Sequence, residues 1–144
     1  MKPTIDSPRH RLQQETIEEK TARVLAYLDP VTEARVHTLV HVLRAHTPFS
    51  YVRHLSPRQL AAWARVFLQF IEERRQPFAV RLLPLRAEGH ALLLTNCPDA
   101  PFLLDSVQLW LTRQGVRHQV ISHPLLSVRR RGGAVQRLEG VEGG

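Results

Sequence analysis

The residues with the clearest chemical potential in this chain lie in the loop 96–103, which reads NCPDAPFL. Its two prolines end the preceding strand pattern, because proline has no N–H to donate to a neighbouring strand. The loop leads into a segment with helical spacing, so it presents unpaired backbone N–H groups at the positive end of a helix dipole. Such a site suits the carboxylate of a small ligand. We therefore predict a ligand site formed by Asp99, Ala100, Pro101, Phe102 and Leu103.

A second interpretation of the same loop needs no ligand. Asp99 would cap the helix and Pro101 would set its first turn, because both residue types are common where helices begin. Cys97 stands beside Pro98 in this loop. Without a neighbouring base to activate it, we expect an inert thiol.

The spacing of the histidines and serines elsewhere in the sequence does not predict a metal site or a catalytic site. His37 and His41 have the spacing of a two-histidine metal site, but the stretch HTLVH lacks the glutamate of the metalloprotease motif. We expect a partly exposed polar helix face there and no metal. Asp105 and Ser106 are adjacent on a helix, so their side chains point in different directions. No Gly-x-Ser-x-Gly elbow surrounds Ser106 or Ser122, and we predict no catalytic residue and no cofactor.

Periodicity and turn residues predict the elements that position the loop. Apolar residues at helical spacing after Ser-Pro or Asp-Pro indicate helices, and short apolar runs between turn residues indicate strands. The predicted helices span 8–29, 30–47, 57–75 and 101–114, and the predicted strands span 78–85, 90–96, 116–128 and 134–138. The strand, helix and strand over 91–128 predict a right-handed βαβ crossover. These elements place the chain in the α+β class.

The helix over 57–75 carries the strongest local signals. Ser56 followed by Gln59 forms a capping box at its start, and Pro57 occupies the first helical position. Its apolar surface is so wide that the helix must be buried. Gly115 supplies the left-handed residue that commonly ends a helix, here the one over 101–114.

Two stretches, NCPDAPFLLDSV and HQVISHPLLSVRR, carry a family resemblance. They resemble the N-terminal ACT-like region of the large bacterial NAD-dependent glutamate dehydrogenases. The resemblance covers roughly 49–133 and is weaker before the loop. Pro98 and Ala100 depart from the family's pattern, which has an acidic residue and a methionine there. The matching residues are Asp99, Pro101, Phe102, Leu103, Asp105, Ser106, Val107, His123, Pro124, Val128, Arg129 and Arg130.

The resemblance implies an ACT-type, ferredoxin-like antiparallel sheet with helices on one face, preceded by N-terminal helices. From the third helix onward the elements run α, β, β, α, β, β, which is the ferredoxin-like ring cut at a different place. In this permuted sheet, 134–138 would lie between 90–96 and 116–128. We expect an N-terminal helical extension over 1–48, the ACT-like domain over 49–139 and a disordered tail over 140–144.

The resemblance also implies a role. The chain would be a non-catalytic regulatory or assembly module, with an amino-acid effector bound near the loop 99–103. Its partners would be the remainder of a glutamate dehydrogenase or a second copy of itself. Nothing in the chain can carry hydride transfer, so we expect no enzymatic activity of its own.

Composition leaves an alternative function open. The 144 residues carry a net charge of +7, nearly all from arginine, and such a balance favours anionic partners. A small basic nucleic-acid-binding α+β protein is therefore the alternative. Against it, the predicted strands carry Phe78 and few other aromatics on which bases could stack. With one cysteine, no signal peptide and no apolar run near the roughly 20 residues of a membrane span, we expect a cytoplasmic protein.

Overall fold

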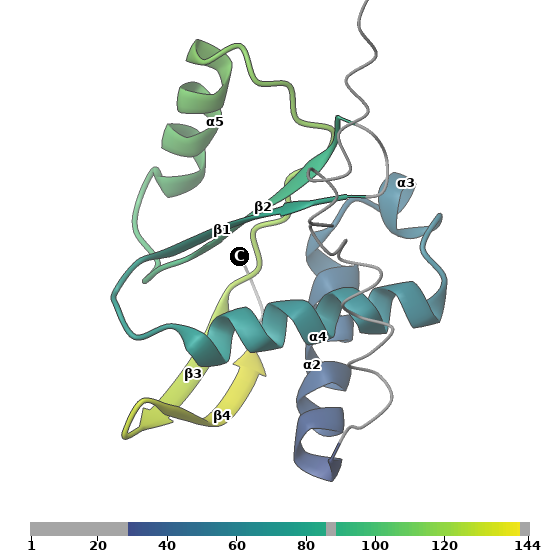
Figure 1. Ribbon diagram of the computed structural model, residues 1–144, viewed down its shortest axis with the longest axis vertical. Helices are drawn as coiled ribbons and strands as arrows, with labels where there is room; N and C mark the ends of the chain where they lie inside the picture. The colour runs from purple at the N-terminus through teal and green to yellow at the C-terminus, as the bar shows by residue number, and fades with distance from the viewer. Residues whose placement is uncertain (1–28, 86–88, 142–144) are drawn as a thin grey trace, which may run out of the picture.

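A computed structural model describes residues 29–85 and 89–141, and its central element is the helix α4, Pro57–Glu73 (Figure 1). The capping box predicted for this helix is confirmed. The Ser56 hydroxyl accepts from the Gln59 N–H at 3.1 Å, and the Gln59 side chain accepts from the Ser56 N–H at 2.8 Å. These two bonds satisfy backbone donors that have no partner inside the helix.

Two apolar faces of α4 pack against different elements, which confirms the predicted burial. One face meets the helix α2, Pro30–His46, and the strand β4, Ala134–Gly140. The other face meets the antiparallel strands β1, Ala79–Pro84, and β2, Ala91–Asn96. The first core contains Val36, Leu39, Leu43, Leu60, Ala64, Leu68, Ile71, Val135 and Leu138. The second contains Val66, Phe70 and Leu94, with Trp63, Phe67, Ala79, Leu83, Leu85 and Leu92 against them.

The N-terminal half of the described chain follows the predicted helices. Asp29 caps α2 by accepting from the Thr32 N–H at 2.9 Å, and Pro30 stands at the first helical position. A short helix α3, Phe49–Val52, lies in the predicted linker. The helix predicted over 8–29 lies outside the described residues, apart from Asp29. The helix α2 shares its core with α4. The domain boundary predicted between 48 and 49 stays a prediction.

The strands form two separate two-stranded antiparallel sheets, β1–β2 and β3–β4, where β3 is Leu126–Arg131. Both predicted hairpins are confirmed, with Leu82 opposite Leu93 in one and Val128 opposite Leu138 in the other. The predicted single sheet with 134–138 at its centre is wrong, because β4 pairs only with β3. The physical reason is that α4 lies between the two hairpins and packs a different one of its own faces against each (Figure 1).

The segment after β2 also differs from the prediction in detail. The helix α5 is Leu103–Arg113, and Gly115 follows its C-cap with a left-handed φ of 68°, as expected. The strand predicted over 116–128 begins only at Leu126, since Pro124 has no N–H for a ladder. The βαβ crossover is wrong because β2 and β3 belong to different sheets. The α+β class itself is confirmed.

Candidate functional site

The predicted ligand loop connects β2 to α5 as expected, and most of it is exposed. Asp99, Ala100, Pro101 and Phe102 are exposed, and Leu103 is half-buried. Phe102 is the N-cap of α5, with φ 60° and ψ 12° and no side-chain hydrogen bond to the helix. The alternative in which Asp99 caps the helix is therefore wrong.

The first turn of α5 offers free backbone donors. The Leu103 N–H reaches the Ala100 carbonyl at 3.4 Å, and the Ser106 N–H donates to the Phe102 carbonyl at 2.9 Å. Between them, the N–H groups of Leu104 and Asp105 have no backbone acceptor within the described parts of the chain. These donors point out of the positive end of the helix, which is the geometry expected for binding a carboxylate.

Two carboxylates lie at the same helix start. Asp99 lies in the loop, and Asp105 lies in the first turn of α5; both are exposed. Acidic groups at a helix N-terminus are stabilised by the helix dipole. The loop therefore combines hydrogen-bond donors for an anionic group with carboxylates that could meet a cationic one.

The other chemically suggestive residues form no catalytic arrangement. The rings of His37 and His41 lie 4.9 Å apart on α2, and both residues are exposed. Across residues 29–85 and 89–141, no group of three or more His, Cys, Asp or Glu side chains could hold a metal. Ser122 has a structural role: its hydroxyl donates to the His46 carbonyl at 3.2 Å and accepts from Thr47 at 3.0 Å.

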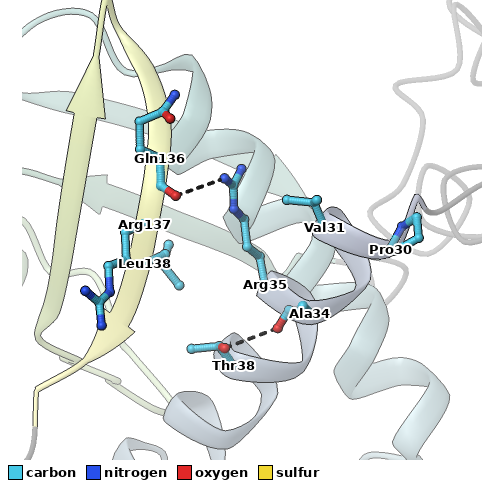
Figure 2. A pocket seen from close by; sticks show the side chains of 8 residues that line it. All are labelled: Pro30, Val31, Ala34, Arg35, Thr38, Gln136, Arg137 and Leu138. Carbon is cyan, nitrogen blue, oxygen red and sulfur yellow. Dashed lines mark hydrogen bonds between the residues drawn. The ribbon is translucent and has the colours of Figure 1, made fainter.

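A groove of about 410 Å³ lies between α2 and β4 (Figure 2). Arg35 crosses it and donates from Nη2 to the carbonyl oxygens of Val135 at 2.8 Å and Gln136 at 3.5 Å. Arg137 in its wall is paired with Glu139 at 2.6 Å. Both cations already have partners, and Arg35 links α2 to β4 across the groove. The lining residues are Pro30, Val31, Ala34, Arg35, Thr38, Gln136, Arg137 and Leu138.

Sequence reasoning missed an apolar surface on the β1–β2 hairpin. Val80 is 53% exposed and Leu82 is 66% exposed, and Leu93 lies opposite Leu82 on the same face. The signal was present in the sequence, since AVRLLP and ALLLTN place apolar residues on both faces of the hairpin. Such strands are typical of a sheet that is covered on both sides.

The helix α5 adds further exposed apolar side chains. It lies beyond the β1–β2 hairpin from α4 (Figure 1), and Leu111 is its one buried residue. Trp110, next to Leu111 in the sequence, is 57% exposed. Phe102 and Leu109 are exposed as well.

Comparison with known proteins gives one finding. A family model described as "Glutamate dehydrogenase, ACT1 domain" matches residues 39–143, well over half of the chain. A search of curated proteins and a search of solved structures returned no match. No helix in the described segments has the length and apolar character needed to cross a membrane. The family match confirms the resemblance carried by the loop and by the strand ending in Arg129 and Arg130, and the chain belongs to the glutamate dehydrogenase ACT1-domain family.

Proposed function

We propose that this chain is a non-catalytic regulatory module of a glutamate dehydrogenase and docks on another domain of that enzyme. The observation that carries the proposal is the outer face of the β1–β2 hairpin, formed by Val80, Leu82 and Leu93. We call it the hairpin face. It leaves large aliphatic side chains in water on the side of the sheet that α4 does not cover.

The chemistry of the hairpin face favours a folded protein surface as its occupant. Burial of apolar area contributes about 25 cal/mol per Å², so three aliphatic side chains offer a substantial gain when a partner covers them. The family to which the chain belongs is by its description a domain of glutamate dehydrogenase. Another domain of that enzyme is therefore the occupant to which we commit, and a second copy of this chain is the other outcome that the experiment distinguishes.

Sedimentation velocity tests the docking. The chain is measured alone and with glutamate dehydrogenase from the same source. We expect a complex with the enzyme that Leu82→Asp weakens at least tenfold, because a carboxylate would lose its hydration in the interface. Val31→Asp on α2, which packs on the opposite face of α4, is the matched control and should leave the affinity unchanged. If Leu82→Asp binds as well as the unchanged chain, or only self-association is seen, docking on the enzyme is wrong.

A second role, effector sensing, is supported by the loop 99–103. The free N–H groups of Leu104 and Asp105 suit a carboxylate, and the carboxylates of Asp99 and Asp105 suit an ammonium group. An α-amino acid carries both groups. We therefore propose that a free amino acid binds at this loop and alters the docking of the module.

Calorimetric titration with glutamate, aspartate and branched-chain amino acids tests this role. We expect heat from at least one of them, with an affinity that Asp99→Asn lowers. Asp29→Asn, at the distant start of α2, changes charge equally and should leave the heat unchanged. An absence of heat from all of these amino acids would leave a purely architectural role.

The alternative function is that of a nucleic-acid-binding protein. The family match gives no support to a nucleic-acid-binding protein, and none of the four described strands contains an aromatic residue on which a base could stack.

We propose that the module acts in the cytoplasm, with Cys97 as a free thiol. Fluorescent tagging of the chain in its own cell would test the location, and enrichment at the cell envelope would contradict it.

A further inference from the structure

The groove between α2 and β4 leaves apolar surface open beside the start of α2 (Figure 2). Val31 in its wall is 59% exposed, and Pro30 and Ala34 next to it are exposed as well. Leu138 lines the groove from the β4 side. A volume of about 410 Å³ leaves room for several aliphatic side chains. An apolar occupant would therefore gain by leaving water and entering the groove.

The polar groups of the groove are already engaged within the fold. Arg35 donates to two carbonyl groups of β4, and Arg137 is paired with Glu139. The Thr38 hydroxyl donates to the Ala34 carbonyl at 3.1 Å. A small polar ligand would have to displace these bonds, which costs as much as it gains. The groove therefore favours an apolar occupant over a charged one.

The sequence before α2 supplies such an occupant. Residues 1–28 lie outside the described part of the chain, and in them Ile17, Val24 and Leu28 recur at the spacing of one helix face. This apolar stripe belongs to the helix predicted over 8–29. As a helix, residues 17–28 would be about 18 Å long, whereas the part of α2 that lines the groove is about 13 Å long. The stripe is thus long enough to cover the groove.

The junction between this segment and α2 favours a return along α2. Asp29 is extended, with φ −71° and ψ 159°, and a residue before proline is kept out of the helical conformation. A helix that ends before Asp29 therefore cannot continue straight into α2. Helices joined by so short a connection are usually antiparallel neighbours. That arrangement would bring Leu28 next to Val31, at the end of the groove.

Charges along α2 favour the same direction. Glu33 lies in its first turn and Arg44 in its last, both are exposed, and neither forms an ion pair among the described residues. An antiparallel segment would place Arg23 towards Glu33, and Glu15 and Glu18 towards Arg44. Exposed ion pairs add little stability, but complementary charges select one orientation over another.

We infer that residues 17–28 of this chain occupy the groove between α2 and β4, as a helix antiparallel to α2. The segment is covalently attached at one end of the groove, so it is present there at a high effective concentration. The family model begins at residue 39, so most of this contact lies before the matched residues. The groove and the β1–β2 hairpin lie on different faces of α4, and the inference does not depend on the proposed function.

Hydrogen exchange of the full chain, read by mass spectrometry, tests the contact. We expect the amides of residues 17–28 to exchange at least tenfold more slowly than those of an isolated peptide of the same sequence. Val31→Asp should return them to nearly the rate of the peptide, because its carboxylate would lose hydration under an apolar segment. The variant should leave α2 folded, since the helix dipole favours a carboxylate in the first turn.

Two further variants make the test specific. Val80→Asp is the matched control, because it makes the same change at a valine of similar exposure, 53%, on the β1–β2 hairpin. It should leave the exchange of residues 17–28 unchanged. Val24→Asp alters the segment instead of the groove and should cause the same loss of protection as Val31→Asp. The double variant should lose no more than either one, because both remove one contact.

The amides of α4 should exchange equally in all these chains, which shows that the fold is kept. Dilution separates the chain's own segment from that of a second copy, and protection should be the same over a tenfold range of concentration. Protection that falls on dilution would assign the groove to a second copy and overturn the inference. Rates in the unchanged chain equal to those of the peptide, or equal protection in Val31→Asp and Val80→Asp, would overturn it as well.

Discussion

Phe102 adopts a backbone conformation that side chains other than glycine seldom take. Its φ of 60° lies in the left-handed region, and its ring is 78% exposed. The left-handed conformation costs an L-residue about 1–2 kcal/mol, and the exposed ring recovers little of this by packing. Such strain persists where the surrounding structure holds it, and it is common at ligand-binding loops.

Replacing Phe102 tests whether this strain serves the loop. Phe102→Gly should raise the free energy of unfolding by about 0.5–1 kcal/mol relative to Phe102→Ala, because glycine adopts this conformation without steric cost. Urea unfolding measures the difference, and calorimetry should show weaker amino-acid binding in Phe102→Gly. Phe102→Ala removes the ring and keeps the strain, so it is the matched control. A glycine variant less stable than the alanine variant would contradict the expectation.

Asp29 carries the clearest dependence on pH among single residues. Its carboxylate accepts from the Thr32 N–H at 2.9 Å and from the Thr32 hydroxyl at 2.7 Å, and these two bonds lower its pKa from the ordinary value of 3.8. A lowered pKa in the folded state means that this stabilisation is present above pH 3.8 and is lost as pH falls through the folded value.

Acid unfolding of Asp29→Asn isolates this contribution. Asparagine caps a helix at every pH, so the variant should lack the part of the stability loss that begins below about pH 3.8. Thermal unfolding by circular dichroism between pH 2.5 and 6 measures it. Identical pH profiles for Asp29→Asn and the unchanged chain would show that the cap does not depend on ionisation.

At the scale of elements, α4 organises the molecule because both of its faces are buried. Leu68 is fully buried in the core shared with α2 and β4, whereas Leu82 on β1 is mostly exposed. The same leucine-to-alanine change therefore has different consequences at the two positions. Truncation of a buried leucine removes packing and leaves a cavity, while truncation of an exposed one does neither.

Leu68→Ala should lower the free energy of unfolding by about 3 kcal/mol, within the usual range of about 2–5 kcal/mol for buried leucines. Leu82→Ala, its matched control, should change it by about 0.5 kcal/mol or less. Urea unfolding followed by tryptophan fluorescence measures both. If the two variants lose equal stability, the hairpin face is packed in the folded chain and the docking proposal loses its basis.

The elements that sequence predicted well are those with local signals. Ser56 and Gln59 lie three residues apart and satisfy each other's backbone, and the end of α5 follows from Gly115 alone. The sheet could not be predicted in the same way, since β4 and β2 are far apart in sequence and their relation depends on where α4 packs. The start of β3 was placed too early, because aliphatic residues from Val116 onward resemble a strand, although the described strand pairing begins only at Leu126.

The candidate site was predicted in position and missed in geometry. The loop 99–103 lies between β2 and α5 as expected, but Phe102 rather than Asp99 stands at the helix start. Three arginines that bond to the last turn of α4, Arg35, Arg81 and Arg130, lie far apart in the sequence, so no sequence motif brings them together. Only the packing of α2, β1 and β3 on one helix end does so.

At the scale of the whole molecule, the last described strand, β4, packs against the first described helix, α2. A Cβ added at Gly140 would lie 2.8 Å from the Val42 Cγ2 atom, closer than packed atoms allow. Val42 is buried, and its short branched side chain has little freedom to move away. Glycine is needed here for close approach of two elements.

Gly140→Ala should therefore lower the free energy of unfolding by about 1–3 kcal/mol, the usual cost of overpacking. In a chain that already carries Val42→Ala, the same change should cost much less, because the opposing methyl groups are gone. A double-mutant cycle by urea unfolding measures this coupling. Additive effects of the two substitutions would show that β4 and α2 do not press on each other at this point.

The weak attachment of α5 has a consequence for how the molecule opens. With one buried residue, and with irregular chain on both sides of it, α5 can detach while α4 and both hairpins stay folded. Its amide hydrogens should then exchange with solvent deuterium far sooner than those of α4, through an opening of α5 alone. A bound amino acid at Phe102 would slow that exchange selectively.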